Sequence, residues 1–124
     1  LMKNDQINLI TPGSRFEGLV EFSDYTRFEG FIKGTLRGNK GSELILGENG
    51  VVEGLIEAET VTIDGFVRGN ITATHKVVIS ETGRVIGEIK SPSVAIKFGG
   101  YFDGTCAMDS AAVIESDKNQ PSSS

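Results

Sequence analysis

Apolar and polar residues alternate along most of this chain, and the alternation is organised around recurring glycines. In each repeat a glycine follows an apolar residue by two positions, and a second apolar residue follows the glycine by two. The six copies read FEGLVEF, IKGTLRG, VEGLIEA, VRGNITA, VIGEIKS and FDGTCAM. Apolar positions with a period of two are typical of β-strands, in which successive side chains point to opposite faces. The pattern therefore predicts an all-β protein.

The copies follow one another at short and nearly regular intervals. They begin at Phe16, Ile32, Val52, Val67, Val85 and Phe102, which are 16, 20, 15, 18 and 17 residues apart. A unit this short cannot bury its own apolar face, whereas coils wound one above another pair their strands in parallel, about 4.8 Å apart, around a shared core. We therefore expect a single-domain parallel β-helix (solenoid) of about six rungs, each rung being one turn of the coil, over residues 12–110. Residues 1–11 and 111–124 are expected to be short flexible tails.

Stacking the copies places equivalent residues in columns along the helix. Three columns are almost wholly apolar and are predicted to face inward: Phe16, Ile32, Val52, Val67, Val85 and Phe102; then Val20, Leu36, Ile56, Ile71, Ile89 and Cys106; then Phe22, Gly38, Ala58, Ala73, Ser91 and Met108. A glycine-only column, Gly18, Gly34, Gly54, Gly69, Gly87 and Gly104, predicts a corner at which the backbone bends or approaches its neighbour closely. The outward column Glu17, Lys33, Glu53 and Arg68 alternates in charge, which supports this register.

A second short apolar motif recurs between the copies. Its members are the pairs Leu44 and Leu46, Val61 and Ile63, Val77 and Ile79, and Val94 and Ile96. The spacing of two within each pair again indicates a strand with one inward face. Each rung is therefore expected to contain two or three short strands joined by turns.

The spacing of the repeats also favours one handedness of the helix. Left-handed β-helices hold a strict six-residue period, and Val67, Ala73, Ile79 and Val85 do lie six apart. The other intervals break that period, which favours a right-handed helix. Among left-handed enzymes, the zinc site of γ-type carbonic anhydrases takes three histidines, whereas this chain has only His75. A left-handed hexapeptide-type acyltransferase and a monomeric β-helical binding module remain alternatives.

Composition narrows the chemistry that the chain can support. With a net charge of -5 and no basic cluster, the chain lacks the signature of nucleic-acid binding. No stretch of about 18 apolar residues or signal peptide is present, which predicts a cytoplasmic protein.

Cys106 is the single cysteine and falls in an inward column, so we expect a core residue rather than a nucleophile. No phosphate-binding glycine motif occurs. We therefore expect no catalytic, cofactor-binding or metal-binding residues, and no enzyme.

The whole array of V-x-G-x-I-x-A copies and intervening V-x-I pairs, from about Thr11 to Ser110, resembles the bactofilins, a family of bacterial cytoskeletal proteins. The resemblance implies a right-handed β-helix that joins end to end, without nucleotide, into non-polar filaments. It further implies a scaffold for cell-shape or cell-wall factors. The implied partners are further copies of the chain, cell-wall or morphogenesis proteins, and the inner face of the cytoplasmic membrane.

The bulk of the side chains increases towards both ends of the inward columns. The first column has Ile or Val in its middle and Phe at each end, and the third has Gly, Ala or Ser between Phe22 and Met108. Open β-helix ends expose strand edges and a slice of the core, which favours association. We therefore predict a polymer interface formed by Phe16, Val20, Phe22, Phe98, Tyr101, Phe102 and Met108. Capping of the ends by the tails is the alternative, and AAVI from Ala111 fits a further strand.

Overall fold

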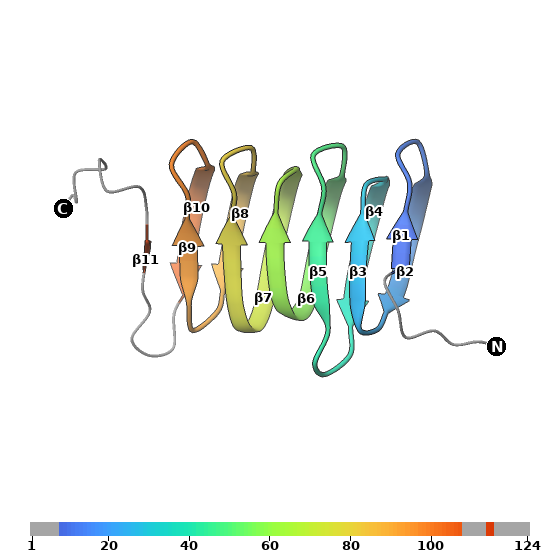
Figure 1. Cartoon of the computed structure of the whole chain (residues 1–124), viewed down its shortest axis with the longest axis horizontal. Coiled ribbons are helices and arrows are strands. Elements are labelled where there is room, and N and C mark those ends of the chain that lie inside the picture. Colours follow the sequence, from blue (N-terminus) through green and yellow to red (C-terminus); the bar gives the residue numbers. More distant parts are fainter. Residues whose placement is uncertain (1–7, 108–113, 116–124) are drawn as a thin grey trace.

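The computed structural model describes residues 8–107 and 114–115, and these form strands and turns without a helix. The chain winds as a solenoid along the long axis of the molecule (Figure 1). In the view of Figure 1 the front strands run upward and the back strands downward, while successive coils advance from right to left. This sense of winding is right-handed, so the predicted right-handed parallel β-helix of about six rungs is confirmed.

Two rows of strands make up the solenoid, and the longest strands contribute to both. The back row contains β2 (Arg15–Phe22), β4 (Phe31–Gly38), the first part of β6 (Val51–Ile63), the first part of β7 (Phe66–Ile79), β8 (Arg84–Lys90) and β10 (Tyr101–Ala107). The front row contains β1 (Asn8–Ile10), β3 (Tyr25–Phe28), β5 (Glu43–Leu46), the second parts of β6 and β7, β9 (Val94–Ile96) and β11 (Ile114–Glu115). All neighbouring strands are parallel.

The register of the back row reproduces the first two predicted inward columns. Val67, for example, pairs with Val52 on one side and Val85 on the other, and Ile71 pairs with Ile56 and Ile89. The middle members of both columns are fully buried. Burying apolar side chains in stacked layers is the main force that holds such a coil together, at about 25 cal/mol per Å² removed from water. The six-rung core is therefore continuous from one end of the helix to the other.

The front row carries the second apolar motif and extends it by one member. Leu44 and Leu46 pair with Val61 and Ile63, and the same register continues through β7 to β9. On the other side, Leu44 and Leu46 pair with Thr26 and Phe28 of β3. Both β3 residues are buried, and the hydroxyl of Thr26 donates a hydrogen bond to the carbonyl of Ser23 at 3.5 Å. Threonine in the inward slot concealed this strand from the sequence pattern.

The glycine column forms the place at which successive rungs approach most closely. Gly34, Gly54, Gly69, Gly87 and Gly104 have φ values between 141° and 150°, and each would place a Cβ against the carbonyl oxygen of the glycine one rung earlier. No L-residue fits this combination of dihedral angle and contact. The predicted close approach is confirmed, and the glycines lie within strands, so the ladder of hydrogen bonds continues through them.

Replacing Gly69 by alanine is expected to destabilise the domain by about 3 kcal/mol or more, because both the dihedral angle and the carbonyl of Gly54 oppose a Cβ. Gly18 provides a matched control. Its φ is also positive, at 101°, yet a Cβ there meets no atom within 4 Å, since the first rung of the column has no predecessor. Urea unfolding at low protein concentration should show a clearly smaller loss for Gly18→Ala. Equal losses would show that close approach of the rungs does not explain the column.

Charged side chains of alternating sign follow the predicted register, but they do not form ion pairs with one another. Glu17, Lys33, Glu53 and Arg68 are consecutive partners in the ladder. Among the described residues, however, the ion pairs within 4 Å are Arg27–Glu29 and Arg37–Glu57. Arg37 and Glu57 are partners on adjacent rungs, with 2.8 Å between Nε and Oε1. Exposed pairs of this kind contribute about 0.2 to 1 kcal/mol, so charge supports the register without dictating it.

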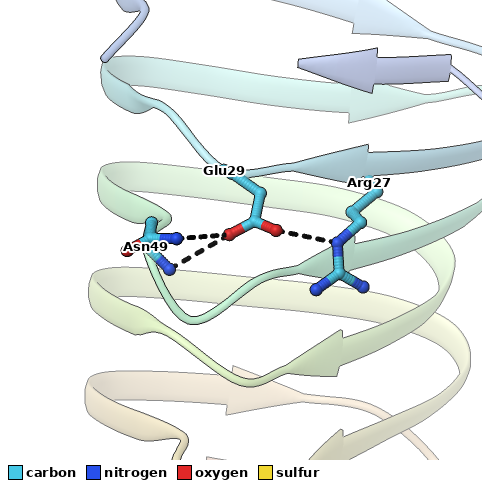
Figure 2. Close-up of polar contacts among 3 residues, drawn as sticks. All are labelled: Arg27, Glu29 and Asn49. Atoms are coloured by element: carbon cyan, nitrogen blue, oxygen red, sulfur yellow. Dashed lines mark hydrogen bonds and ion pairs between the residues drawn. The ribbon is translucent and has the colours of Figure 1, made fainter. Parts of the chain in front are cut away.

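Glu29 links the turns of different rungs (Figure 2). Its carboxylate accepts a hydrogen bond from Nε of Arg27 at 2.8 Å, and from both the backbone N–H and Nδ2 of Asn49 at 3.2 Å. The hydrogen bond from Arg27 and those from Asn49 lower the pKa of Glu29, against the opposing effect of desolvation. A Cβ on Gly47 would collide with this carboxylate, so the glycine leaves room for it.

We expect Glu29→Gln to lower the free energy of unfolding at pH 7 by about 1 kcal/mol, because the hydrogen bonds to a charged acceptor are weakened at a partly exposed site. The folded pKa lies below the ordinary value of 4.5, so this stabilisation is present above pH 4.5 and is lost as the pH falls through the folded pKa. Urea unfolding between pH 7 and pH 3 measures the difference. Glu48→Gln, at an exposed position beside Asn49, is the control. A difference that does not shrink on acidification would contradict the assignment.

Two four-residue turns, residues 39–42 and 47–50, account for the longest interval between repeats. Residues 39–42 connect β4 to β5 and project below the neighbouring turns in Figure 1. The backbone N–H of Gly41 donates to Oε1 of Glu59 at 2.6 Å, which holds this long turn against the next rung. Ser42, the last residue of this turn, is buried. The extra residues of the 20-residue interval are thus accommodated in turns, and the strands keep their register.

Two short strands lie within the segments that the sequence assigns to tails. β1 pairs in parallel with β3, and β11 pairs in parallel with β9. The strand expected from AAVI is present in part, since β11 comprises Ile114–Glu115. Apart from these two strands, the predicted domain boundaries at residues 12 and 110 stay predictions.

Candidate polymerisation surfaces at the two ends

The C-terminal end of the solenoid presents large apolar side chains beside a strand edge. Within the described residues β10 forms a ladder with β8 alone, which leaves its other edge open. Phe98, in the turn before β10, is 58% exposed and Tyr101 is 44% exposed. Phe102 is half-buried and packs on the core. Three of the four predicted C-terminal residues thus lie together at this end, whereas Met108 lies outside the described residues.

Polar contacts fix the orientation of Tyr101 at this end. The Arg84 guanidinium lies 5.3 Å from the centre of the Tyr101 ring, and the Tyr101 hydroxyl donates to Oδ2 of Asp103 at 3.5 Å. Cys106 is half-buried in the last rung, and burial raises the pKa of its thiol. A thiol with a raised pKa is a poor nucleophile at neutral pH. The geometry therefore agrees with a packing role for Cys106.

The N-terminal end is built from the free edges of β1 and β2. Among described residues, β1 pairs with β3 alone and β2 with β4 alone. Phe16 is half-buried, and its ring lies 5.8 Å from that of Phe28 at an angle of 49°. Val20 is also half-buried in the same strand. Both residues therefore retain surface that a second molecule can cover.

Phe22 differs from the other residues proposed for this end. It is only 9% exposed, because its ring occupies the space that a side chain at Gly38 would take. Large and small residues thus alternate between the first two rungs of the third column. Phe22 therefore contributes to the core and offers little surface for association.

Two exposed leucines at the N-terminal end are absent from the sequence-based set. Leu9 in β1 is 59% exposed and Leu19 in β2 is 53% exposed. Leu19 occupies an outward slot immediately after Gly18, and Leu9 falls in a segment assigned to a tail. An exposed leucine in an edge strand indicates an association surface. The sequence alone does not show which strands lie at the edge, so these two leucines could not be identified from it.

The larger of two hollows elsewhere on the surface is lined by carboxylates that already make contacts within the fold. Two open hollows, of about 540 and 490 Å³, flank the long turn. Glu57 and Glu59 line the larger one, but Glu57 pairs with Arg37 and Glu59 accepts the hydrogen bond from Gly41. Over the described residues there is no group of three or more His, Cys, Asp and Glu side chains that could hold a metal ion. The same residues include no helical segment with the length and apolar character of a membrane span.

Over the described residues the fold is a right-handed β-solenoid whose apolar core reaches both terminal rungs and whose end strands each have an unpaired edge. Residues 8–107 match the family model for bactofilins, described as polymer-forming cytoskeletal proteins. The chain therefore belongs to the bactofilin family, and the resemblance seen in its repeats is confirmed. This membership favours a structural protein over the left-handed acyltransferase considered from the sequence.

Two curated relatives come from Myxococcus xanthus (strain DK1622). The bactofilin BacO is 41% identical over 80 residues, which are 63% of this chain and 64% of that protein. The bactofilin BacP is 35% identical over 100 residues, which are 81% of this chain and 41% of that protein. The chain thus spans less than two thirds of the length of either relative. No solved structure gives a significant match.

Proposed function

We propose that this chain self-assembles end to end, without nucleotide, into non-polar filaments. The observation that carries the proposal is made on residues 8–107: at both ends of the solenoid, strand edges without a partner among these residues lie beside exposed apolar side chains. Natural proteins normally cover or charge such edges, because exposed backbone N–H and C=O groups pair with other chains. The description of the family as polymer-forming supports the same conclusion.

In a non-polar filament each end joins a like end. Such a contact is isologous, since the same surface is used on both subunits and must complement itself. The N-terminal surface offers Leu9, Phe16 and Leu19, and the C-terminal surface offers Phe98 and Tyr101. Apolar surfaces complement themselves more readily than surfaces of a single charge, which would repel their own copies. Both ends therefore satisfy the requirement.

The cellular role that we propose is a scaffold for cell-shape or cell-wall factors in the cytoplasm. The partners are further copies of the chain, cell-wall or morphogenesis proteins, and the inner face of the cytoplasmic membrane. Membership of a polymer-forming cytoskeletal family supports this role. A monomeric binding module is the competing function, and it requires that both open ends stay unoccupied.

Electron microscopy of the purified chain without nucleotide tests the proposal. We expect filaments or sheets to form in the absence of ATP and GTP, because association relies on preformed apolar ends. Sedimentation at increasing protein concentration provides a second measurement. A monomer that persists at high concentration would reject self-assembly and favour the binding module.

A further inference from the structure

Both ends of the solenoid finish on the same row of strands. Among the described residues the first strand is β1 and the last is β11, and both belong to the front row. Over these residues the front row contains seven strand segments and the back row six. Since neighbouring strands lie about 4.8 Å apart, the front row is longer than the back row by about one strand spacing. Each end is therefore a step, and the front row is its projecting side.

The step leaves an open strand edge beside a projecting strand at each end. At the C-terminal end β11 pairs with β9, while β10 pairs with β8 and has no partner on its outer edge among the described residues. At the N-terminal end β1 pairs with β3, and β2 pairs with β4. Unpaired backbone N–H and C=O groups are costly when a contact buries them. A second subunit therefore has to complement a step rather than a flat surface.

A contact between like ends relates two subunits by a two-fold axis perpendicular to the filament. If this axis runs parallel to the strands, the front row of one subunit continues as the back row of the next. If it runs from the front row to the back row, front meets front and back meets back. Front strands run upward and back strands downward in Figure 1, so the strands that meet are antiparallel in both arrangements. Strand direction alone therefore does not select one of them.

The lengths of the two rows select the arrangement. Counted over the described strands, front-to-front contacts would give each pair of subunits fourteen segments along one face of the filament and twelve along the other. The shorter face would lack two strand spacings per pair, about 10 Å, and its strand edges would stay unpaired. Front-to-back contacts place seven segments of one subunit and six of the next along each face, so both faces hold thirteen. Both sheets can then continue through every junction.

We propose that each end junction joins the front row of one subunit to the back row of the next. This inference rests on the end-to-end assembly proposed above and specifies its geometry. At the C-terminal junction β11 of each copy adds to the open edge of β10 in the other copy, in antiparallel orientation, and at the N-terminal junction β1 adds to β2 in the same way. Main-chain hydrogen bonds of the added strands contribute to the affinity. Along each face of the filament, front and back rows of successive subunits alternate.

Cross-linking across the C-terminal junction tests this geometry. Ala95 lies at an outward position of β9 in the front row, and Asp103 is exposed in β10 of the back row. Ala95→Cys and Asp103→Cys are made separately in a Cys106→Ser chain, assembled alone or mixed, and treated with a bismaleimide whose linker spans three strand spacings, about 14 Å.

We expect covalent dimers only in the mixture. Front-to-back contacts bring β9 of one copy within two strand spacings, about 10 Å, of β10 of the other copy on the same face. Two copies of the same residue then lie on opposite faces with the core between them. In chains that form filaments, dimers of either variant alone, or none in the mixture, would overturn the front-to-back junction and leave end-to-end assembly standing. A native chain that stays monomeric would overturn both.

Ile114→Pro tests the role of β11 in the junction. Proline lacks an N–H and cannot extend a ladder on both edges of a strand. We expect the filaments to be replaced by dimers joined through their N-terminal ends, with twice the mass of one chain by light scattering. Ile114→Val keeps a strand-forming residue and should polymerise as the native chain does. A strand that merely caps the end would give longer filaments when disrupted, so longer or unchanged filaments in Ile114→Pro would overturn the proposal.

Discussion

Long filaments are expected to disappear when Phe102 is replaced by arginine. The phenylalanine is half-buried in β10, the last back-row strand, one edge of which has no partner among the described residues. Each aromatic side chain buried in an end contact contributes about 1.5 to 3 kcal/mol. Its loss therefore raises the protein concentration needed for assembly by at least about ten-fold. An arginine can extend to solvent from this position, so the solenoid itself should remain folded.

Filament length by electron microscopy and β-type circular dichroism together measure this result. Phe16→Arg is the corresponding change at the N-terminal end, and each variant alone should still associate through its intact end. The double variant lacks both end contacts and should form no filaments. Normal polymerisation of both single variants would show that the subunits do not join through their ends.

Ile71→Asp is expected to unfold the domain. Ile71 is fully buried between Ile56 and Ile89 in the middle of the stack. A lone carboxylate in this position costs several kcal/mol or becomes protonated, and a domain of this size is stable by only about 5 to 15 kcal/mol. Loss of the β-type circular dichroism signal and of a cooperative urea transition would show the effect.

Asn70→Asp is the matched control because it introduces the same carboxylate at the adjacent, exposed position. We expect its free energy of unfolding to stay within about 0.5 kcal/mol of the native value. A stable, folded Ile71→Asp protein would mean that inward and outward faces are interchanged. The pair of variants therefore tests the direction in which a whole strand faces.

Most of the fold was predictable because two constraints repeat on every rung. Only glycine fits where Gly69 and its equivalents lie against the preceding carbonyl, and only apolar residues fit the slots of Val67 and Ile71. Six repetitions of both constraints leave one alignment of the copies, and the ladder follows it. The β3 strand was missed because Thr26 places a polar residue in an inward slot, where its hydroxyl bonds to a backbone carbonyl.

The candidate surfaces were less predictable because they depend on where the stack ends. The large side chain of Phe22 at the end of the third inward column suggested an exposed residue. Its ring instead fills the space beside Gly38. Leu9 and Leu19 stand out only once β1 and β2 are known to be edge strands. The contacts of Glu29 were similarly hidden, since they join turns 20 residues apart that the repeat pattern leaves variable.

Among the described turns that lead from the back row to the front row, residues 39–42 form the longest, and this turn follows β4 in the second rung. In a filament joined through like ends, two such turns lie three rung spacings apart across each N-terminal junction and nine apart across each C-terminal junction. At about 4.8 Å per rung the intervals alternate between about 14 and about 43 Å. Binding sites for a protein that recognises this turn would therefore occur along the filament in closely spaced pairs. A bivalent ligand with a short linker would bind both sites of one pair and would not reach the next pair.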